Sequence, residues 1–139
     1  MLKKLWADGK PDLHFKHRRE QAAWLTRING QYNLVPANLL ESTPCTVSPD
    51  FATRPDSTIA LIHLHPYFLD EIYPRCDKKG QPIQYPNGYW NVGRYPGGLS
   101  ETDVASVTSE VPIEFMMDRD TYIKFNSAGV LASARRCSH

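Results

Sequence analysis

The chain of 139 residues carries 16 Lys and Arg residues against 15 Asp and Glu residues, which gives a formal net charge of +1. A nearly neutral chain does not attract a bulk polyanion, so we expect no nucleic acid partner. The length suits one domain with one hydrophobic core. No apolar run approaches the roughly 20 residues of a membrane-spanning helix, so we expect no membrane insertion.

The N-terminal stretch predicts a loose entry segment over residues 1–12, followed by a single domain over residues 13–139. Its first residues are basic but no apolar run follows them, so we expect no secretory signal. Residues 13–20 predict a short helix. The basic cluster KHRR at residues 16–19 is short, and we interpret it as a solvated face near the terminus.

The three cysteines, Cys45, Cys76 and Cys137, are widely separated in the sequence. No Cys-x-x-Cys spacing occurs, which argues against a zinc site built from cysteines. The odd number also argues against a disulfide framework. We therefore expect reduced thiols in a cytosolic environment.

A β-hairpin is predicted around Asn29-Gly30, because this dipeptide lies between two apolar runs and is the strongest short signal for a hairpin turn. The following stretch, residues 36–57, is rich in Pro, Ser and Thr. It predicts mostly loop, with a short helix near residues 38–42.

Residues 58–65, with the sequence TIALIHLH, predict the clearest strand. Side chains alternate between the faces of a strand, so His63 and His65 point the same way while Leu64 faces the core. Two imidazoles roughly 6.5–7 Å apart at their Cα atoms can converge on one ion. A catalytic zinc ion needs a third protein ligand and keeps one position open for water.

The segment 67–99 is a long irregular stretch with many aromatic residues, and we expect it to form a loop over a cleft. Tyr89, Trp90 and Tyr95 are candidates to bind substrate there. Ordinary packing of a long loop is the more common role for such residues, and it stays open as the alternative.

Ser100 and Asp103 predict the start of a helix, because Ser is a good N-cap and an acidic residue three positions later completes a capping pattern. Asp103 is also the best candidate for the third metal ligand, and Ser100 could donate a hydrogen bond to an oxyanion. Three strands are predicted after this helix. Strands, a helix and a terminal antiparallel meander together predict an α+β (mixed α/β) fold.

The motif HLHP at residues 63–66, followed by SETD at residues 100–103, resembles the signature of the JAMM (JAB1/MPN) zinc metallopeptidases. That signature is an upstream Glu, then His-Ser/Thr-His-Pro, then Ser-x-x-Asp. The resemblance implies one Zn²⁺ ion held by His63, His65 and Asp103, and hydrolysis of a peptide, isopeptide or related amide bond. It also implies a JAB/MPN-like, cytidine-deaminase-like sheet flanked by helices.

The resemblance also implies a general base upstream of the histidines and a serine that stabilises the tetrahedral intermediate, here Ser100. Glu20 is the preferred base, because it opens EQAAWLTRINGQY, which resembles the family's Glu, small residues, strand and Gly-x-Tyr turn. Glu41 is the rival, although it lies in a Pro/Ser/Thr-rich loop. Leu64 departs from the usual Ser or Thr of the motif.

The last strands resemble those of bacterial JAB-like domains at the C-terminal ends of polymorphic toxins of the Rhs and contact-dependent systems. This implies a toxic effector that acts in the cytoplasm of a target cell, with a secretion-system carrier, a cognate immunity protein and a protein or peptide-like substrate. A metal-dependent nuclease toxin and a non-catalytic JAB-like binding module remain alternatives. The stretch between the two motifs is longer than in the eukaryotic deubiquitinases, so a ubiquitin-like substrate is not implied.

Overall fold

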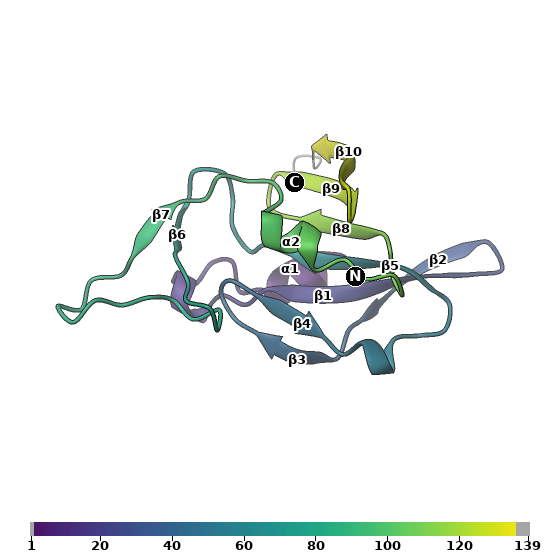
Figure 1. Cartoon of the computed structure of the whole chain (residues 1–139), viewed down its shortest axis with the longest axis horizontal. Helices are drawn as coiled ribbons and strands as arrows, with labels where there is room; N and C mark the ends of the chain where they lie inside the picture. Colours follow the sequence, from purple (N-terminus) through teal and green to yellow (C-terminus); the bar gives the residue numbers. More distant parts are fainter. Residues whose placement is uncertain (1, 136–139) are drawn as a thin grey trace.

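The computed structural model describes residues 2–135 and is built around a mixed sheet of six strands in the order β10-β9-β8-β5-β1-β2 (Figure 1). β5 and β8 are parallel neighbours, and the other neighbouring pairs of this sheet are antiparallel. The six strands are β1 (Gln21–Ile28), β2 (Gln31–Pro36), β5 (Thr58–Leu64), β8 (Glu114–Met117), β9 (Thr121–Asn126) and β10 (Gly129–Arg135). Together with the helices, they confirm the predicted α+β class.

Smaller elements surround this sheet. Two additional two-stranded sheets are formed by β3 (Leu39–Ser42) with β4 (Val47–Pro49), and by β6 (Ile72–Pro74) with β7 (Val92–Arg94). The α-helices are α1 (Leu2–Asp8) and α2 (Glu101–Ala105), and short 3-10 helices cover Phe15–His17 and Phe51–Thr53. Within residues 2–135, no helix is long and apolar enough to cross a membrane.

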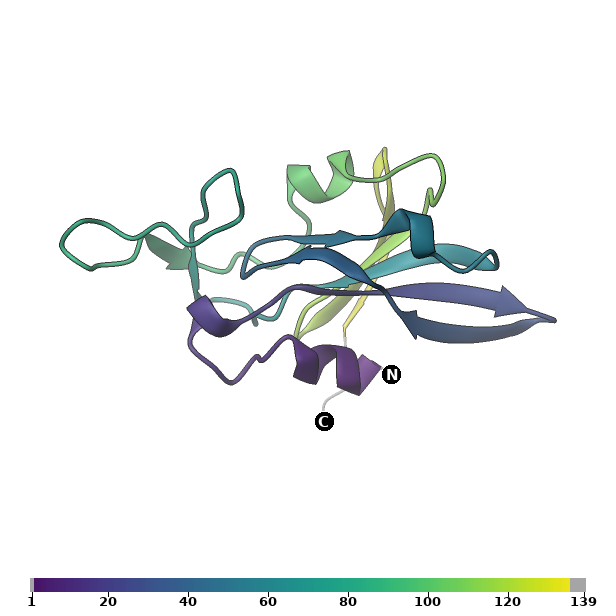
Figure 2. The same ribbon diagram turned by 90° about the horizontal axis from the view of Figure 1, so that it is seen from below.

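The two faces of the central sheet are covered by different elements. α1 and α2 lie on opposite sides of it (Figure 2). The alternation of β5 explains this division, because Ile62 and Leu64 are buried in the cluster that α1 covers. Leu61 points to the other face and packs with Trp24 in a cluster that β3 and β4 cover. His63 of β5 and His65, directly after it, belong to this second face.

The hairpin predicted at Asn29-Gly30 is confirmed. β1 and β2 pair from Ile28 opposite Gln31, which leaves a two-residue turn. Asn29 and Gly30 have φ values of 50° and 78°. Positive φ at both positions is what a type I′ turn requires, and Asn-Gly satisfies it at low steric cost. The predicted strand over residues 58–65 and the terminal meander are also confirmed.

The N-terminal prediction was wrong, because residues 1–12 include the helix α1 rather than only a loose segment. Leu2, Leu5 and Trp6 recur at helical spacing, and Leu5 is buried against the sheet. Residues 13–20 form only a 3-10 turn instead of the predicted short helix.

The prediction of a short helix at residues 38–42 was also wrong, and the stretch 36–57, predicted as mostly loop, contains two strands. Residues in this range form the β3–β4 hairpin. Leu39 and Val47 pack against the Trp24 cluster, so contacts with a distant part of the chain decide the local structure. This hairpin becomes one wall of the cleft described below.

Cys45 and Cys76 form a disulfide that closes a sequence separation of 31 residues, with their Cα atoms 6.3 Å apart. The expectation of reduced thiols was therefore wrong for this pair, whereas Cys137 lies outside the described residues. Spacing in the sequence does not show that β6 is folded beside the β3–β4 turn. The bond fastens the aromatic segment 67–99 to the β3–β4 hairpin.

The basic cluster at residues 16–19 is not simply a solvated face. Arg18 is only 8% exposed. Its Nη1 donates to the carbonyl of Pro66 at 2.9 Å, its Nη2 pairs with Glu71, and its guanidinium lies 5.0 Å from the centre of the Tyr67 ring. Arg18 therefore anchors the segment that leaves the end of β5.

Candidate metal centre

The sheet register brings His63 of β5 and His65, which directly follows β5, beside Glu20, which directly precedes β1. β1 and β5 are antiparallel with Ala22 opposite His63. In an antiparallel pair, a step of two residues back from Ala22 matches a step of two residues forward from His63. Glu20, just before β1, therefore lies next to His65. Residues that lie opposite each other in a sheet point to the same face. The three side chains are buried, and the closest approach of Glu20 to His65 is 4.0 Å between Oε1 and Nε2.

The side chains of three residues converge at this point, with one ring nitrogen from each histidine and both oxygens of one carboxylate. His63 Nε2 lies 3.2 Å from His65 Nε2, Asp103 Oδ1 lies 3.4 Å from His63 Nε2, and Asp103 Oδ2 lies 3.5 Å from His65 Nε2. Ligands at zinc distances of about 2.0–2.1 Å are separated by about 3.3–3.4 Å in a tetrahedral site. Each of these contacts is close to that spacing, and with one ligand atom from each residue the three atoms all lie within 4.8 Å of one another. The group of His63, His65 and Asp103, named here the donor triangle, could therefore hold a metal ion.

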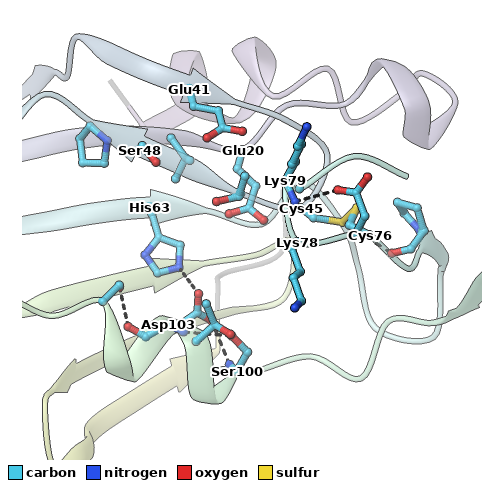
Figure 3. Close-up of a pocket in the computed structure, with 18 of the residues that line it drawn as sticks. Glu20, Glu41, Cys45, Ser48, His63, Cys76, Lys78, Lys79, Ser100 and Asp103 are labelled. Atoms are coloured by element: carbon cyan, nitrogen blue, oxygen red, sulfur yellow. Dashed lines mark hydrogen bonds and ion pairs between the residues drawn. A yellow bond between two sulfur atoms is a disulfide. The ribbon is translucent and has the colours of Figure 1, made fainter. Parts of the chain in front are cut away.

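Asp103 is fixed in this place by the helix start that the sequence predicts. Ser100 is the N-cap of α2, and its Oγ accepts the N–H of Asp103 at 3.1 Å. The N–H of Ser100 donates in return to Asp103 Oδ2 at 2.9 Å, which completes a capping box. The same carboxylate thus caps the helix and faces both histidines. Figure 3 shows its side chain pointing toward His63.

The ionisation of His63 and Asp103 is coupled. Burial lowers the pKa of His63, but contacts with Asp103 and Glu114 outweigh it and raise this pKa to about 10. Burial raises the pKa of Asp103, but the two histidines outweigh it and hold this pKa well below its ordinary value. When no metal ion is bound, a proton on His63 therefore offsets the negative charge of the neighbouring Asp103 carboxylate.

Glu20 is the better placed of the two candidate bases. Burial raises the pKa of its carboxyl group to about 7, against the opposing effect of the histidines. Both Glu20 and Glu41 line the same cleft, but Glu41 is exposed. Within residues 2–135, Glu41 forms no ion pair with either histidine, whereas Glu20 reaches His65.

Glu114 is a member of the site that the sequence did not suggest. It lies on β8 opposite Leu61, on the same face as the histidines, and its Oε1 is 3.7 Å from His63 Nδ1. It is 3% exposed. A charged residue at the start of the apolar stretch EFMM is the one signal that could have marked it, because buried carboxylates need a partner.

The three aromatic residues predicted to bind substrate lie in different surroundings. Tyr89 is 74% exposed, and Trp90 packs edge-on against Phe15 with ring centres 5.6 Å apart. Tyr95 is 5% exposed, and its hydroxyl lies 3.0 Å from His65 Nδ1. The aromatic residue of segment 67–99 that lines the cleft is Tyr73.

The candidate site opens into a cleft of about 770 Å³ between α2 and the β3–β4 hairpin. Glu20, His63, Ser100 and Asp103 line one part of it, and the Cys45–Cys76 disulfide lines another (Figure 3). Two of the three ligand residues, His63 and Asp103, therefore border a space that a bound molecule could occupy. No family model matches the chain, and neither a curated protein nor a solved structure matches it, so the assignment of the site rests on this geometry.

Proposed function

We propose that the chain is a zinc-dependent hydrolase of the JAMM type that cleaves a peptide, isopeptide or related amide bond. The observation that carries this proposal is the convergence of His63, His65 and Asp103. The two Nε2 atoms lie 3.2 Å apart, and each lies within 3.5 Å of an oxygen of the Asp103 carboxylate. Two neutral imidazoles and one carboxylate suit zinc, and three protein ligands leave a position open for catalysis.

A bound zinc ion would act as a Lewis acid and make a water molecule acidic near neutral pH. Glu20 takes the proton from the attacking water as the carbon–oxygen bond forms. It then gives this proton to the amine nitrogen as the carbon–nitrogen bond breaks, so the products are a carboxylic acid and an amine. A carboxyl group with a pKa of about 7 is suited to both transfers.

Ser100 is placed to assist the same reaction. Its Oγ accepts the N–H of Asp103, so its own hydroxyl proton is available to donate. The hydroxyl is exposed at the cleft, beside the donor triangle. A hydrogen bond to the oxygen that becomes negatively charged would stabilise the transition state more than the ground state.

The biological setting of the proposal is a toxic effector that a carrier exports and an immunity protein neutralises by covering the cleft. The Cys45–Cys76 disulfide supports export, because disulfides persist in oxidising compartments and are rare in the cytosol. The disulfide therefore favours an effector that acts in an oxidising compartment over one that acts in the cytoplasm of a target cell. The target there would be a protein or peptide-like amide.

Zinc should stabilise the folded chain. At a free zinc concentration of 100 times the dissociation constant, the free energy of unfolding should rise by about 2.7 kcal/mol, and a chelator should reverse this. His63→Ala and Asp103→Ala should abolish the rise. His17→Ala, which removes an exposed histidine, is the control that should keep it. Thermal unfolding with and without zinc, together with elemental analysis, would measure both effects.

An equal response of the wild type, His63→Ala and Asp103→Ala would refute the metal centre. Zinc binding without amide hydrolysis would instead favour the non-catalytic binding module. Degradation of DNA or RNA that is lost in His63→Ala would favour the nuclease.

Zinc affinity should rise with pH. The pKa of His63 is raised to about 10 by its carboxylate partners, so the metal-free site holds a proton there at pH 7 that zinc must displace. The apparent dissociation constant should fall about tenfold for each pH unit between roughly pH 7 and 8.5. Chelator competition at several pH values would measure it, and a pH-independent affinity would contradict this proton displacement.

A further inference from the structure

A hydroxyl group bridges one of the histidines to a carboxylate behind the candidate metal centre. Tyr95 Oη lies 3.0 Å from His65 Nδ1 and 3.1 Å from Asp118 Oδ2. All three side chains are buried, with exposed fractions of 8% for His65, 5% for Tyr95 and 2% for Asp118. This chain of hydrogen bonds, named here the His65 relay, joins the residue that follows β5, segment 67–99 and the turn between β8 and β9.

The direction of the relay follows from the groups that compose it. Asp118 Oδ1 accepts three hydrogen bonds, from the N–H of Asp120 at 2.8 Å, the N–H of Thr121 at 2.8 Å and Thr121 Oγ1 at 3.0 Å. Its Oδ2 accepts from the hydroxyl of Tyr95. The hydroxyl has thereby used its proton, so its remaining role toward His65 is that of an acceptor.

The relay therefore selects one tautomer of His65. Nδ1 must carry the proton that Tyr95 accepts, which leaves a lone pair on Nε2. That lone pair points into the donor triangle, where Nε2 lies 3.2 Å from His63 Nε2 and 3.5 Å from Asp103 Oδ2. A histidine binds a metal through such an unprotonated nitrogen, and a fixed second nitrogen holds the ring in its orientation.

We propose that Tyr95 and Asp118 are positioning residues of the metal centre, which keep His65 in the tautomer and orientation that bind zinc through Nε2. This inference rests on the proposed function, because it assigns the relay a purpose at that metal site. It gives segment 67–99 a role inside the site. Tyr95 lies behind the histidine and orients it, and substrate contact falls to other residues of the cleft.

Two variants separate positioning from simple packing. Tyr95→Phe removes one oxygen atom and should weaken zinc binding by about 10- to 100-fold, as other losses of a hydrogen bond to a ligand histidine do. Asp118→Asn keeps the size of the side chain but replaces the acceptor Oδ2 with an NH₂ group, which can only donate. The remaining oxygen should stay at the Oδ1 position, because three donors point at it. The hydroxyl of Tyr95 would then turn its proton toward Nδ1 and favour the wrong tautomer, so zinc binding should weaken at least as much.

Tyr67→Phe is the matched control. Tyr67 belongs to the same aromatic cluster and is 3% exposed, but its hydroxyl donates to the carbonyl of Pro44 at 3.1 Å. Its zinc affinity should equal that of the wild type. Chelator competition would give the dissociation constants. Nitrogen NMR of the imidazoles in the metal-free proteins would show which ring nitrogen of His65 carries the proton. We expect Nδ1 in the wild type and Nε2 in Asp118→Asn.

The outcomes distinguish this inference from the function on which it rests. If the wild type binds zinc and Tyr95→Phe binds it equally well, the relay is overturned and the metal centre stands. An unchanged His65 tautomer in Asp118→Asn would also overturn the relay. A wild type that binds no zinc would overturn the proposed function and with it the positioning role.

Discussion

Replacing Glu20 with glutamine should abolish amide hydrolysis and leave zinc bound. The amide side chain has nearly the size of the carboxyl group but cannot take the proton from water. A positioned general base contributes about 10²- to 10⁴-fold to a rate, so the turnover number should fall by that factor. A library of unstructured peptides, with the released amines quantified by mass spectrometry, would serve as the substrate, and elemental analysis would show the zinc.

The backbone around Glu20 makes this variant a fair test of chemistry. The N–H of Glu20 donates to the carbonyl of Thr43 at 2.9 Å, and Ser42 Oγ donates to the carbonyl of Glu20 at 2.5 Å. These bonds do not involve the carboxyl group, so they hold the residue in place after substitution. The fold and the metal centre should therefore persist.

Glu41→Gln is the matched control, because Glu41 lines the same cleft but is exposed. Its activity should stay within a few-fold of the wild type. The opposite result, with Glu41→Gln inactive and Glu20→Gln active, would assign the base to Glu41. Full activity in both variants would remove a glutamate base from the mechanism.

The sequence predicted those parts of the site that depend on short-range geometry. Alternation along one strand places His63 and His65 on one face, and the capping pattern of Ser100 and Asp103 sets the orientation of that carboxylate. Both are properties of a few neighbouring residues. The convergence of these residues, and the approach of Glu20 to them, depend on which strands pair. No local pattern predicts that pairing. The resemblance to the JAMM family led us to expect Glu20 near the histidines, and the register of β1 and β5 places it beside His65.

The remaining parts depend on contacts that no local pattern encodes. Glu114 and Asp118 belong to β8 and the turn after it, and they reach the site because β8 pairs with β5 across a crossover of some fifty residues. Tyr95 reaches His65 from the end of β7, in a segment that the sequence predicts only as an irregular loop but that contains the β6–β7 sheet. The β3–β4 hairpin and the Cys45–Cys76 bond likewise follow from docking of distant segments, which is why loop propensity and cysteine counting gave the wrong expectation.

Removing the disulfide should cost a large part of the stability of the domain. A cross-link that closes 31 residues restricts the unfolded chain by about 3.7 kcal/mol at 25 °C in the loop-entropy estimate. The Cys45→Ser/Cys76→Ser variant should therefore unfold with a free energy lower by about 3–4 kcal/mol, or roughly 500-fold in the equilibrium constant. Urea denaturation of the metal-free proteins would measure the difference.

A reductant provides the control for this comparison. It should lower the stability of the wild type to that of the double variant and leave the variant itself unchanged. Equal stability of the oxidised wild type and the variant would show that the bond contributes nothing. Other contacts hold the same segments together, since Gly80 packs closely against Thr46 and Tyr67 donates to the carbonyl of Pro44.

These remaining contacts determine what reduction does to the cleft. If they keep segment 67–99 docked, Tyr95 stays behind His65 and zinc affinity survives reduction despite the loss of stability. If they do not, the His65 relay opens and zinc affinity falls together with stability. We expect the first result, because Tyr95 is also held by Asp118 and by backbone hydrogen bonds to Glu71 and Asp70 that do not involve the disulfide. The same zinc titration, repeated with reductant on the wild type, decides between them.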